Sequence, residues 1–405
     1  MFERAPFEAC PHCRAPDSFG ILSAGGETVR RRCKVCRFAL NEVLPAVDKK
    51  VIYLDQFAIS ELYKIKSKTR RQDAPNLQFW QDFQRLANRA YLLQQAVFPA
   101  SNIHSDETIV SPFASDLGLA HEMMSGDTSF EAAYKVAAQH EFAYAQAFIN
   151  QSPPPELSAD VDDILKGGRN AWLPDMYVTV DMDYSMFADA IRASRASARK
   201  DLQVLADKWA REKPTFDDIL KNEMQSYASA HKQACEYSAK LAARSLESND
   251  NFGFVNAVES SALEQYRALR RFFETSGIPR EHSHAAVLKF REWPALWQLP
   301  SHRIFAYLMA ALGWKISCGQ RRPMEAGILN DFVAISTYGR YVDAMFVDKE
   351  CAELLALGRV RKDVSLKAKV FSLRTREEFL LYLTDLAESA TQEVRHFAKE
   401  IYGIF

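Results

Sequence analysis

Four cysteines near the start of the chain place the strongest constraint on its fold. They form two pairs with the spacing CxxC, in CPHC and CKVC, and are Cys10, Cys13, Cys33 and Cys36. Two thiolates two residues apart can turn back on one ion, and two such turns complete a tetrahedral zinc site. Because so short a module has little core of its own, the metal would contribute most of its folding energy. We therefore predict a zinc ribbon over residues 1–45, with Zn²⁺ in a structural role.

The segment between the pairs, FGILSAGGETVRRRC, predicts a strand, a Gly-Gly turn and a second strand. Arg30, Arg31 and Arg32 lie on the second of these strands and would suit contacts with phosphate. A ribbon that only packs against the rest of the chain, or docks a protein, is an equally ordinary alternative. Four free thiols or a redox pair are the alternative to zinc.

Composition excludes several classes of protein. The net charge is −1, so any basic surface for nucleic acid must be local. The sequence contains no apolar run long enough to span a membrane, and its first residues, MFERAPFEACPHC, lack the apolar core of a signal peptide. We therefore expect a cytoplasmic protein without membrane contact, in which disulfides are rare.

Strand–helix alternation appears on both sides of a long helical region. VIYLDQFAIS predicts a buried strand over residues 51–54 and a helix from residue 56, and AVFPAS, AMFVD and AKVFSL predict three further strands. Residues 116–312 show mostly helical periodicity. We predict an α/β fold in which residues 46–115 and 313–405 form one parallel-sheet domain and residues 116–312 form a large α-helical insertion. Three consecutive domains are the alternative, but each outer part is too short for a complete sheet.

Acidic residues follow the predicted strands. Asp55 and Asp348 each end a short apolar strand, Glu107 lies just past the second strand, and Asp331 begins a late helix. Groups at the carboxyl ends of parallel strands gather in one crevice, where carboxylates repel one another unless they share protons or a cation. Hard oxygen ligands of this kind suit Mg²⁺ or Mn²⁺. The plainer alternative is that Asp55 and Asp348 only cap the helices that follow them.

Three stretches of the chain resemble the PIN-like nuclease domains: VIYLDQFAISEL, PASNIHSDET and NDFVAISTYGRYVDAMFVDKECAELL. YVDAMFVD is similar to the Y-V-D-x-x-x-T-D segment of bacterial PIN-like proteins, although Val347 stands at the usual small polar position. The ribbon and the central helices lie outside the resemblance. It implies a PIN-like fold with four catalytic acids, which are Asp55, Glu107, Asp331 and Asp348.

The resemblance also implies an activity, the hydrolysis of phosphodiester bonds by metal-activated water, most often in RNA. Asp55 and Asp348 would hold Mg²⁺ or Mn²⁺ most directly. Many bacterial relatives are toxins or defence components, so such a role is an expectation here. The rival interpretation is a non-catalytic scaffold, with a degenerate core that binds nucleic acid or protein. In either case the helical insertion is a candidate surface for a protein partner.

Several other residues are candidates for the same site. Two basic runs, KIKSKTRR and GQRRP, would form a rim for a phosphodiester substrate unless they are only solvated charge. The predicted substrate-binding residues are Arg70, Arg71, Arg321 and Arg322. His104 is a candidate general base, but a structural histidine is the favoured interpretation. We expect Asp343 either to orient the start of its strand or to support the acidic site.

Overall fold

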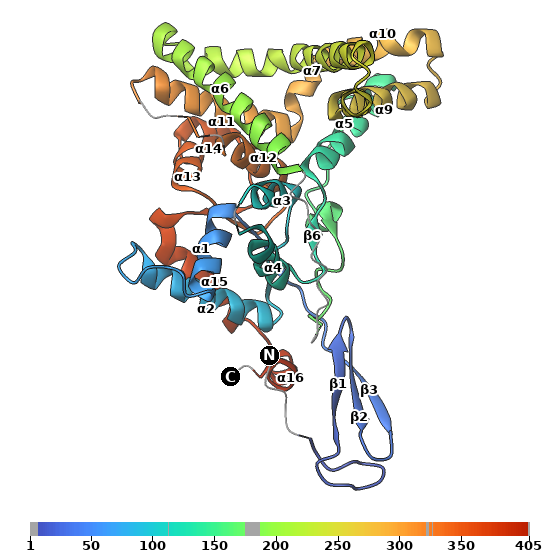
Figure 1. Ribbon diagram of the computed structural model, residues 1–405, viewed down its shortest axis with the longest axis vertical. Coiled ribbons are helices and arrows are strands. Elements are labelled where there is room, and N and C mark those ends of the chain that lie inside the picture. Colours follow the sequence, from blue (N-terminus) through green and yellow to red (C-terminus); the bar gives the residue numbers. More distant parts are fainter. Residues whose placement is uncertain (1–6, 112, 175–186, 321–323, 326, 404–405) are drawn as a thin grey trace.

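The computed structural model describes residues 7–111, 113–174, 187–320, 324–325 and 327–403. Along the longest axis the described chain forms three tiers (Figure 1). A helical tier lies at the top, a parallel sheet with its covering helices lies in the middle, and an antiparallel sheet lies at the base. None of the helices in these ranges is both long enough and apolar enough to cross a membrane.

The antiparallel sheet at the base is the predicted ribbon. Its three strands are β1 (Phe19–Gly25), β2 (Thr28–Cys33) and β3 (Ala39–Val43), in the order β1-β2-β3. The two strands and the Gly-Gly turn expected from the sequence are confirmed, and Gly26 takes the φ of +63° that such a turn needs. The third strand was not predicted, because most residues of ALNEV are exposed and show no apolar alternation.

The middle tier contains the predicted parallel sheet. Its strands are β4 (Lys50–Leu54), β5 (Ala96–Val97), β8 (Ala344–Phe346) and β9 (Lys369–Phe371), in the order β5-β4-β8-β9. All three neighbouring pairs are parallel. Because helices cover both faces of such a sheet, its strands are apolar throughout, which is why their sequences are short unbroken apolar runs.

Alternate side chains of β4 enter two different hydrophobic cores. Val51 and Tyr53 belong to one core, and Ile52 and Leu54 belong to the other. The first core is closed by α11 (Pro300–Ser317), α12 (Ile328–Tyr338) and α13 (Lys349–Leu355), and the second by α1 (Gln56–Lys66), α2 (Leu77–Leu92), α15 (Arg376–Glu388) and α16 (Gln392–Tyr402). The middle tier is therefore a three-layer α/β/α unit.

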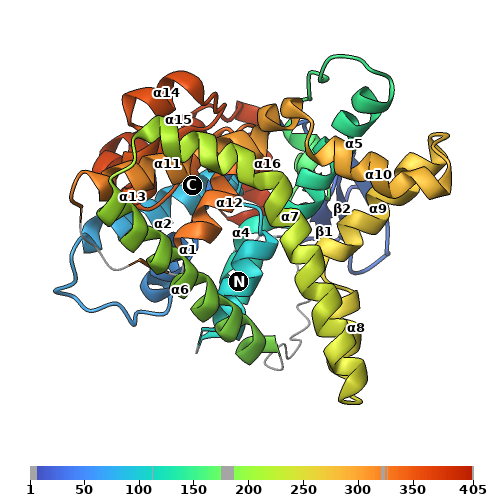
Figure 2. The same ribbon diagram turned by 90° about the horizontal axis from the view of Figure 1, so that it is seen from above.

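The chain between β5 and β8 is mostly helical. Its other helices are α3 (Asn102–Ile109), α4 (Ala114–Ser125), α5 (Ala133–Ile149), α6 (Ala188–Glu212), α7 (Phe216–Glu247), α8 (Asn251–Val258), α9 (Ser261–Thr275) and α10 (Arg280–Arg291). A small hairpin pairs β6 (Ser129–Phe130) with β7 (Leu165–Lys166), and α14 (Gly358–Asp363) follows α13. Seen from above, α7 crosses the whole upper tier and α8 to α10 lie toward one of its ends (Figure 2).

Helix α11 joins the upper tier to the sheet. It belongs to the same core as β4 and β8, and it also packs against α6 and α7. The contact is close at Gly313, where a Cβ atom would lie 2.8 Å from Cδ1 of Ile219 and 2.9 Å from the ring of Trp209. A side chain at position 313 would therefore push α6 and α7 away from the sheet domain.

The ribbon is docked onto the body of the protein by apolar and ionic contacts. Ile21 and Val29 belong to the same hydrophobic core as one face of the parallel sheet. Arg31 lies 2.6 Å from a carboxylate oxygen of Glu400 on α16 and 3.1 Å from one of Glu42. The side chain of Arg31 is thus engaged in docking, which supports the packing alternative for this part of the ribbon.

We predict that Phe346→Ala destabilises the protein by about 3–5 kcal/mol, because it removes a buried ring and leaves a cavity. The ring of Phe346 is 0% exposed, and the centroids of five aromatic rings lie within 6.0 Å of its own. Chemical unfolding followed by circular dichroism measures the change. The control is Leu381→Ala, since Leu381 is 61% exposed and its loss should change stability by less than about 0.5 kcal/mol. Equal effects of the two substitutions would contradict the prediction.

Candidate metal centres

The four cysteines of the ribbon come together at its outer end. All four Sγ atoms lie within 4.8 Å of one another, in Cys10, Cys13, Cys33 and Cys36. Both CxxC pairs close in the same way: the N–H of Arg14 donates to the carbonyl of Cys10 at 2.9 Å, and the N–H of Arg37 donates to that of Cys33 at 3.1 Å. Arg14 and Arg37 both have positive φ, at 58° and 63°. The two turns are therefore copies of one geometry that face each other.

Backbone amides point at these sulfur atoms. The N–H groups of Val35 and Cys36 donate to Sγ of Cys33 at 3.3 and 3.4 Å, and the N–H of Cys13 donates to Sγ of Cys10 at 3.5 Å. Burial alone would raise the pKa of the Cys33 thiol, but its hydrogen bonds lower the pKa to about 6. Four close sulfurs, with amide donors that favour the thiolate form, fit Zn²⁺.

Two predicted acids stand at the carboxyl ends of adjacent strands. Asp55 directly follows β4, and Asp348 follows β8 after one intervening residue. Each caps the next helix: Oδ1 of Asp55 accepts from the N–H of Phe57 at 3.4 Å, and Oδ1 of Asp348 accepts from the N–H of Cys351 at 2.5 Å. After β4 the chain crosses to β5 on one side of the sheet, and after β8 it crosses to β9 on the other side. The order of the strands therefore diverges between β4 and β8. Open α/β sheets form their binding crevice at such a point.

The other two predicted acids reach the same crevice from helices. Glu107 is on α3, and Asp331 is in the first turn of α12. Oxygens of Asp331 and Asp348 lie within 4.8 Å of each other and of Sγ of Cys351. Glu107 accepts a hydrogen bond from Asn330 at 3.0 Å. The structure thus brings Asp331 and Asp348 within ligand distance of each other, and it places Asp55 and Glu107 near enough for their charges to raise the pKa of Asp331.

Electrostatic repulsion shows how close these acids are. Burial, followed by the charges of Asp348 and Glu107, raises the pKa of Asp55 to about 7. Burial and the charges of Asp55, Asp348 and Glu107 raise the pKa of Asp331 well above its ordinary value. A carboxylate that served only as a helix cap would be stabilised in its charged form by the helix dipole. The opposite shift means that the site favours binding of a proton or a cation.

The donors of this crevice fit a hard divalent cation. The carboxylates supply oxygen ligands, which Mg²⁺ and Mn²⁺ prefer. Cys351 is fully buried, and burial together with the charges of Asp331 and Asp348 raises the pKa of its thiol well above the ordinary value. In the absence of a cation these surroundings favour the neutral thiol. The sequence did not indicate the contact of Cys351 with the acids, because nothing in the local pattern marks it.

His104 is structural. It is buried, Nδ1 accepts from the N–H of Ser101 at 3.1 Å, and Nε2 donates to the carbonyl of Leu54 at 2.7 Å. Burial lowers its pKa to about 4, so the ring is neutral near pH 7. Since Leu54 precedes Asp55, the ring fixes the carboxyl end of β4 and with it the position of the acid.

Asp343 orients a strand start, although the strand is the neighbouring β4 and not the β8 strand that follows Asp343. Its Oδ2 accepts from the N–H of Val51 at 2.9 Å. Val51 lies near the amino end of β4, and Asp55 follows the other end. Asp343 therefore acts at the edge of the sheet opposite to the acidic crevice.

Two of the predicted substrate-binding arginines lie beyond the far end of α1. This helix has 11 residues, which is about 16 Å of length, and Asp55 caps its first turn. Arg70 is paired with Glu61, and Arg71 lies 2.7 Å from Asp73. Both guanidinium groups are thus engaged by acids of their own segment. Their role in substrate binding stays a prediction.

A different arginine borders the acids. Nη2 of Arg195 on α6 lies 3.1 Å from Oε1 of Glu107, and the angle of this ion pair falls outside hydrogen-bond geometry. Sequence reasoning missed this residue, although the periodic run RASRASARK was a visible signal. The predicted residues Arg321 and Arg322 lie outside the described part of the chain.

Comparison with protein-family models, with curated proteins and with solved structures found no match to this chain. The resemblance to PIN-like domains therefore rests on the three short stretches of sequence and stays a prediction. The arguments for function below depend on the geometry of the site.

We predict that the purified protein carries one zinc ion per chain and that Cys33→Ser loses it. The substitution removes one of four sulfur ligands and the anchor of two amide hydrogen bonds. Elemental analysis of the metal content makes the measurement. The matched control is Cys318→Ser, because Cys318 is an exposed free thiol outside the cluster. A protein without zinc, or a Cys33→Ser variant that retains it, would refute the assignment.

We predict that, without added divalent cation, the contribution of Asp55 to stability decreases as pH rises from about 4 to about 7, so that the stability of the unaltered protein falls relative to that of Asp55→Asn. Over this range the Asp55 carboxyl, with its pKa raised from 3.8 to about 7, holds more protons in the folded than in the unfolded chain, so its own titration favours unfolding as the pH rises. Added Mg²⁺ should therefore raise the melting temperature more above neutral pH than at acidic pH. Thermal unfolding of zinc-loaded protein tests this, with Asp55→Asn as the variant in which both effects shrink. A pH-independent response to Mg²⁺ in the unaltered protein would contradict the prediction.

Proposed function

We propose that this protein is a metal-dependent nuclease that hydrolyses phosphodiester bonds, with RNA as the expected substrate. The observation that carries the proposal is the convergence of four carboxylates at the point where the order of the parallel strands diverges. They come from four elements that are distant in sequence, so local capping alone does not explain why all four meet.

Helix capping accounts for only part of this arrangement. Each of the two strand-end acids uses Oδ1 for its cap, which leaves the second oxygen of Asp55 and of Asp348 for another ligand. The backbone N–H of Asp348 also faces the carboxylate of Asp55 and lowers its pKa, so the two acids are neighbours. An uncharged cap such as Asn or Ser would serve the helices equally well without repulsion. The retention of four mutually repelling acids supports a role in binding a cation.

Asp55 and Asp348 would hold the cation most directly, and Asp331 and Glu107 would complete its surroundings. When bound, a divalent cation supplies a water of lowered pKa and neutralises negative charge that develops on the phosphate. The protein's own groups hold these acids in place. Asn330 orients Glu107, and His104 fixes the strand end next to Asp55.

The test is cleavage of labelled single-stranded RNA and DNA by zinc-loaded protein. We expect cleavage only with Mg²⁺ or Mn²⁺, and a loss of at least about 100-fold in Asp55→Asn and Asp348→Asn, since each substitution removes a charged ligand. Asparagine preserves the helix cap, so both variants should fold. Electrophoresis of the products and the rate at saturating substrate give the readout.

The control is Glu281→Gln. Glu281 is exposed on α10 in the upper tier, so its substitution should leave the rate unchanged, whereas Glu107→Gln should lower it. Cleavage that survives both strand-end substitutions would refute the proposal. Binding of nucleic acid without any cleavage would favour the rival, a non-catalytic scaffold.

A further inference from the structure

Helix α6 carries a concentrated positive charge along one stretch. Arg192, Arg195 and Arg199 are spaced by three and four residues, which places them within an arc of about 60°, and Lys200 lies about 100° round the helix from Arg199. From residue 190 to residue 200 this helix contains no acidic residue. We call Arg192, Arg195, Arg199 and Lys200 the α6 basic face.

The α6 basic face reaches the acidic crevice through Arg195. Nη2 of Arg195 lies 3.1 Å from Oε1 of Glu107, and its side chain is 25% exposed. This nitrogen is buried in its ion pair with Glu107, so Arg195 marks the place where α6 borders the acidic crevice.

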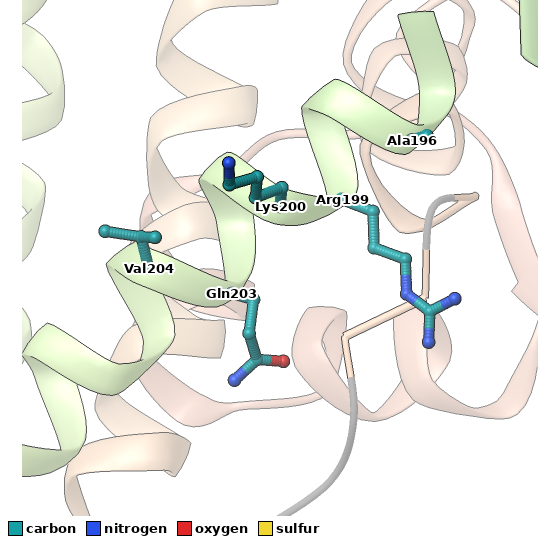
Figure 3. Close-up of a pocket in the computed structure, with 5 residues that line it drawn as sticks. All are labelled: Ala196, Arg199, Lys200, Gln203 and Val204. Carbon is teal, nitrogen blue, oxygen red and sulfur yellow. The ribbon is translucent and has the colours of Figure 1, made fainter. Parts of the chain in front are cut away.

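A surface hollow of about 580 Å³ lies along the same helix, one turn further on. Its described lining residues all belong to α6 and are Ala196, Arg199, Lys200, Gln203 and Val204 (Figure 3). Arg199 and Gln203 extend from the same side of the helix (Figure 3).

The cations at this hollow are only partly engaged. Nε of Arg199 donates to the carbonyl of Met324 at 3.0 Å, which fixes the direction of the side chain. Across the described ranges of the chain, neither Lys200 nor the guanidinium of Arg199 is paired with an acid. Arg192 and Arg195, by contrast, are paired with Asp189 and Glu107. Arg70 and Arg71 are likewise paired with acids.

We propose that the α6 basic face binds the phosphates of a single-stranded nucleic acid and leads the strand into the acidic crevice. The inference rests on the proposed nuclease function and adds the surface that holds the substrate. Contacts of this kind position a strand without reading its sequence, so binding should be insensitive to sequence and sensitive to salt. The four steps from Arg195 to Arg199 cover about 6 Å along the helix, so Arg199 lies about one turn beyond the residue that borders the acids.

The test measures binding separately from cleavage. In the Asp55→Asn protein, fluorescence anisotropy with labelled single-stranded RNA compares Arg199→Gln/Lys200→Gln with the parent. We expect about 10-fold weaker binding, and a slope of log K against log salt reduced by about 1.4 for two lost phosphate contacts. The matched control is Lys208→Gln/Arg211→Gln, which removes the same charge at the far end of α6, where both cations lie near Glu212.

The outcomes separate this inference from the proposed function. If cleavage depends on Asp55 but both double variants bind alike, the α6 basic face is not the substrate surface and the nuclease proposal stands. If no cleavage is found but Arg199→Gln/Lys200→Gln weakens binding selectively, the surface is confirmed and the catalytic proposal fails. A lower melting temperature with an unchanged salt slope would show that Arg199 only supports the segment at Met324, and would overturn the inference. Failure of the parent protein to bind RNA would also overturn it.

Discussion

The parallel pairing of β4 with β8 is the contact on which the rest of the structure depends. It joins the two outer parts of the chain, with Ile52 opposite Ala344 and Leu54 opposite Phe346. The ladder continues to the acid itself, since the N–H of Asp55 donates to the carbonyl of Phe346 at 3.0 Å. The same pairing therefore builds both hydrophobic cores and sets the two strand-end acids side by side.

This arrangement concentrates unfavourable electrostatics at one place. Burial and mutual repulsion raise the pKa values of Asp55 and Asp331, so the folded chain without a cation is less stable near neutral pH than a neutral substitution would make it. Proteins commonly retain such local conflict at functional sites, where the rest of the fold offsets it. Here the offset comes from a rigid surround: helix caps on both acids and the buried ring of His104.

The inserted helices take part in this site and are not simply appended to the sheet. Helix α11 lies in the core beneath the sheet, and the close contact at Gly313 holds α6 and α7 against it. Helix α6 in turn brings Arg195 to Glu107. The insertion thus determines which charges border the acids. The ribbon, docked through Arg31 and Glu400, contributes a second candidate metal centre at the other end of the molecule.

The local sequence pattern was sufficient to predict the parallel strands and the positions of the candidate acids. Unbroken apolar runs predicted the four parallel strands, the CxxC spacing predicted the sulfur cluster, and the place of Asp55 and Asp348 at strand ends predicted their meeting, because parallel strands share one edge. Other features were decided by the tertiary structure alone. Strand β3 is too exposed to show an apolar pattern. The ion pairs of Arg31 with Glu400 and of Arg195 with Glu107 join segments that are far apart in the sequence. The physical reason is that periodicity and capping act within a few residues along the chain. Which charges pair across the fold depends on which surfaces the two hydrophobic cores bring together, and no local pattern in this sequence predicts that.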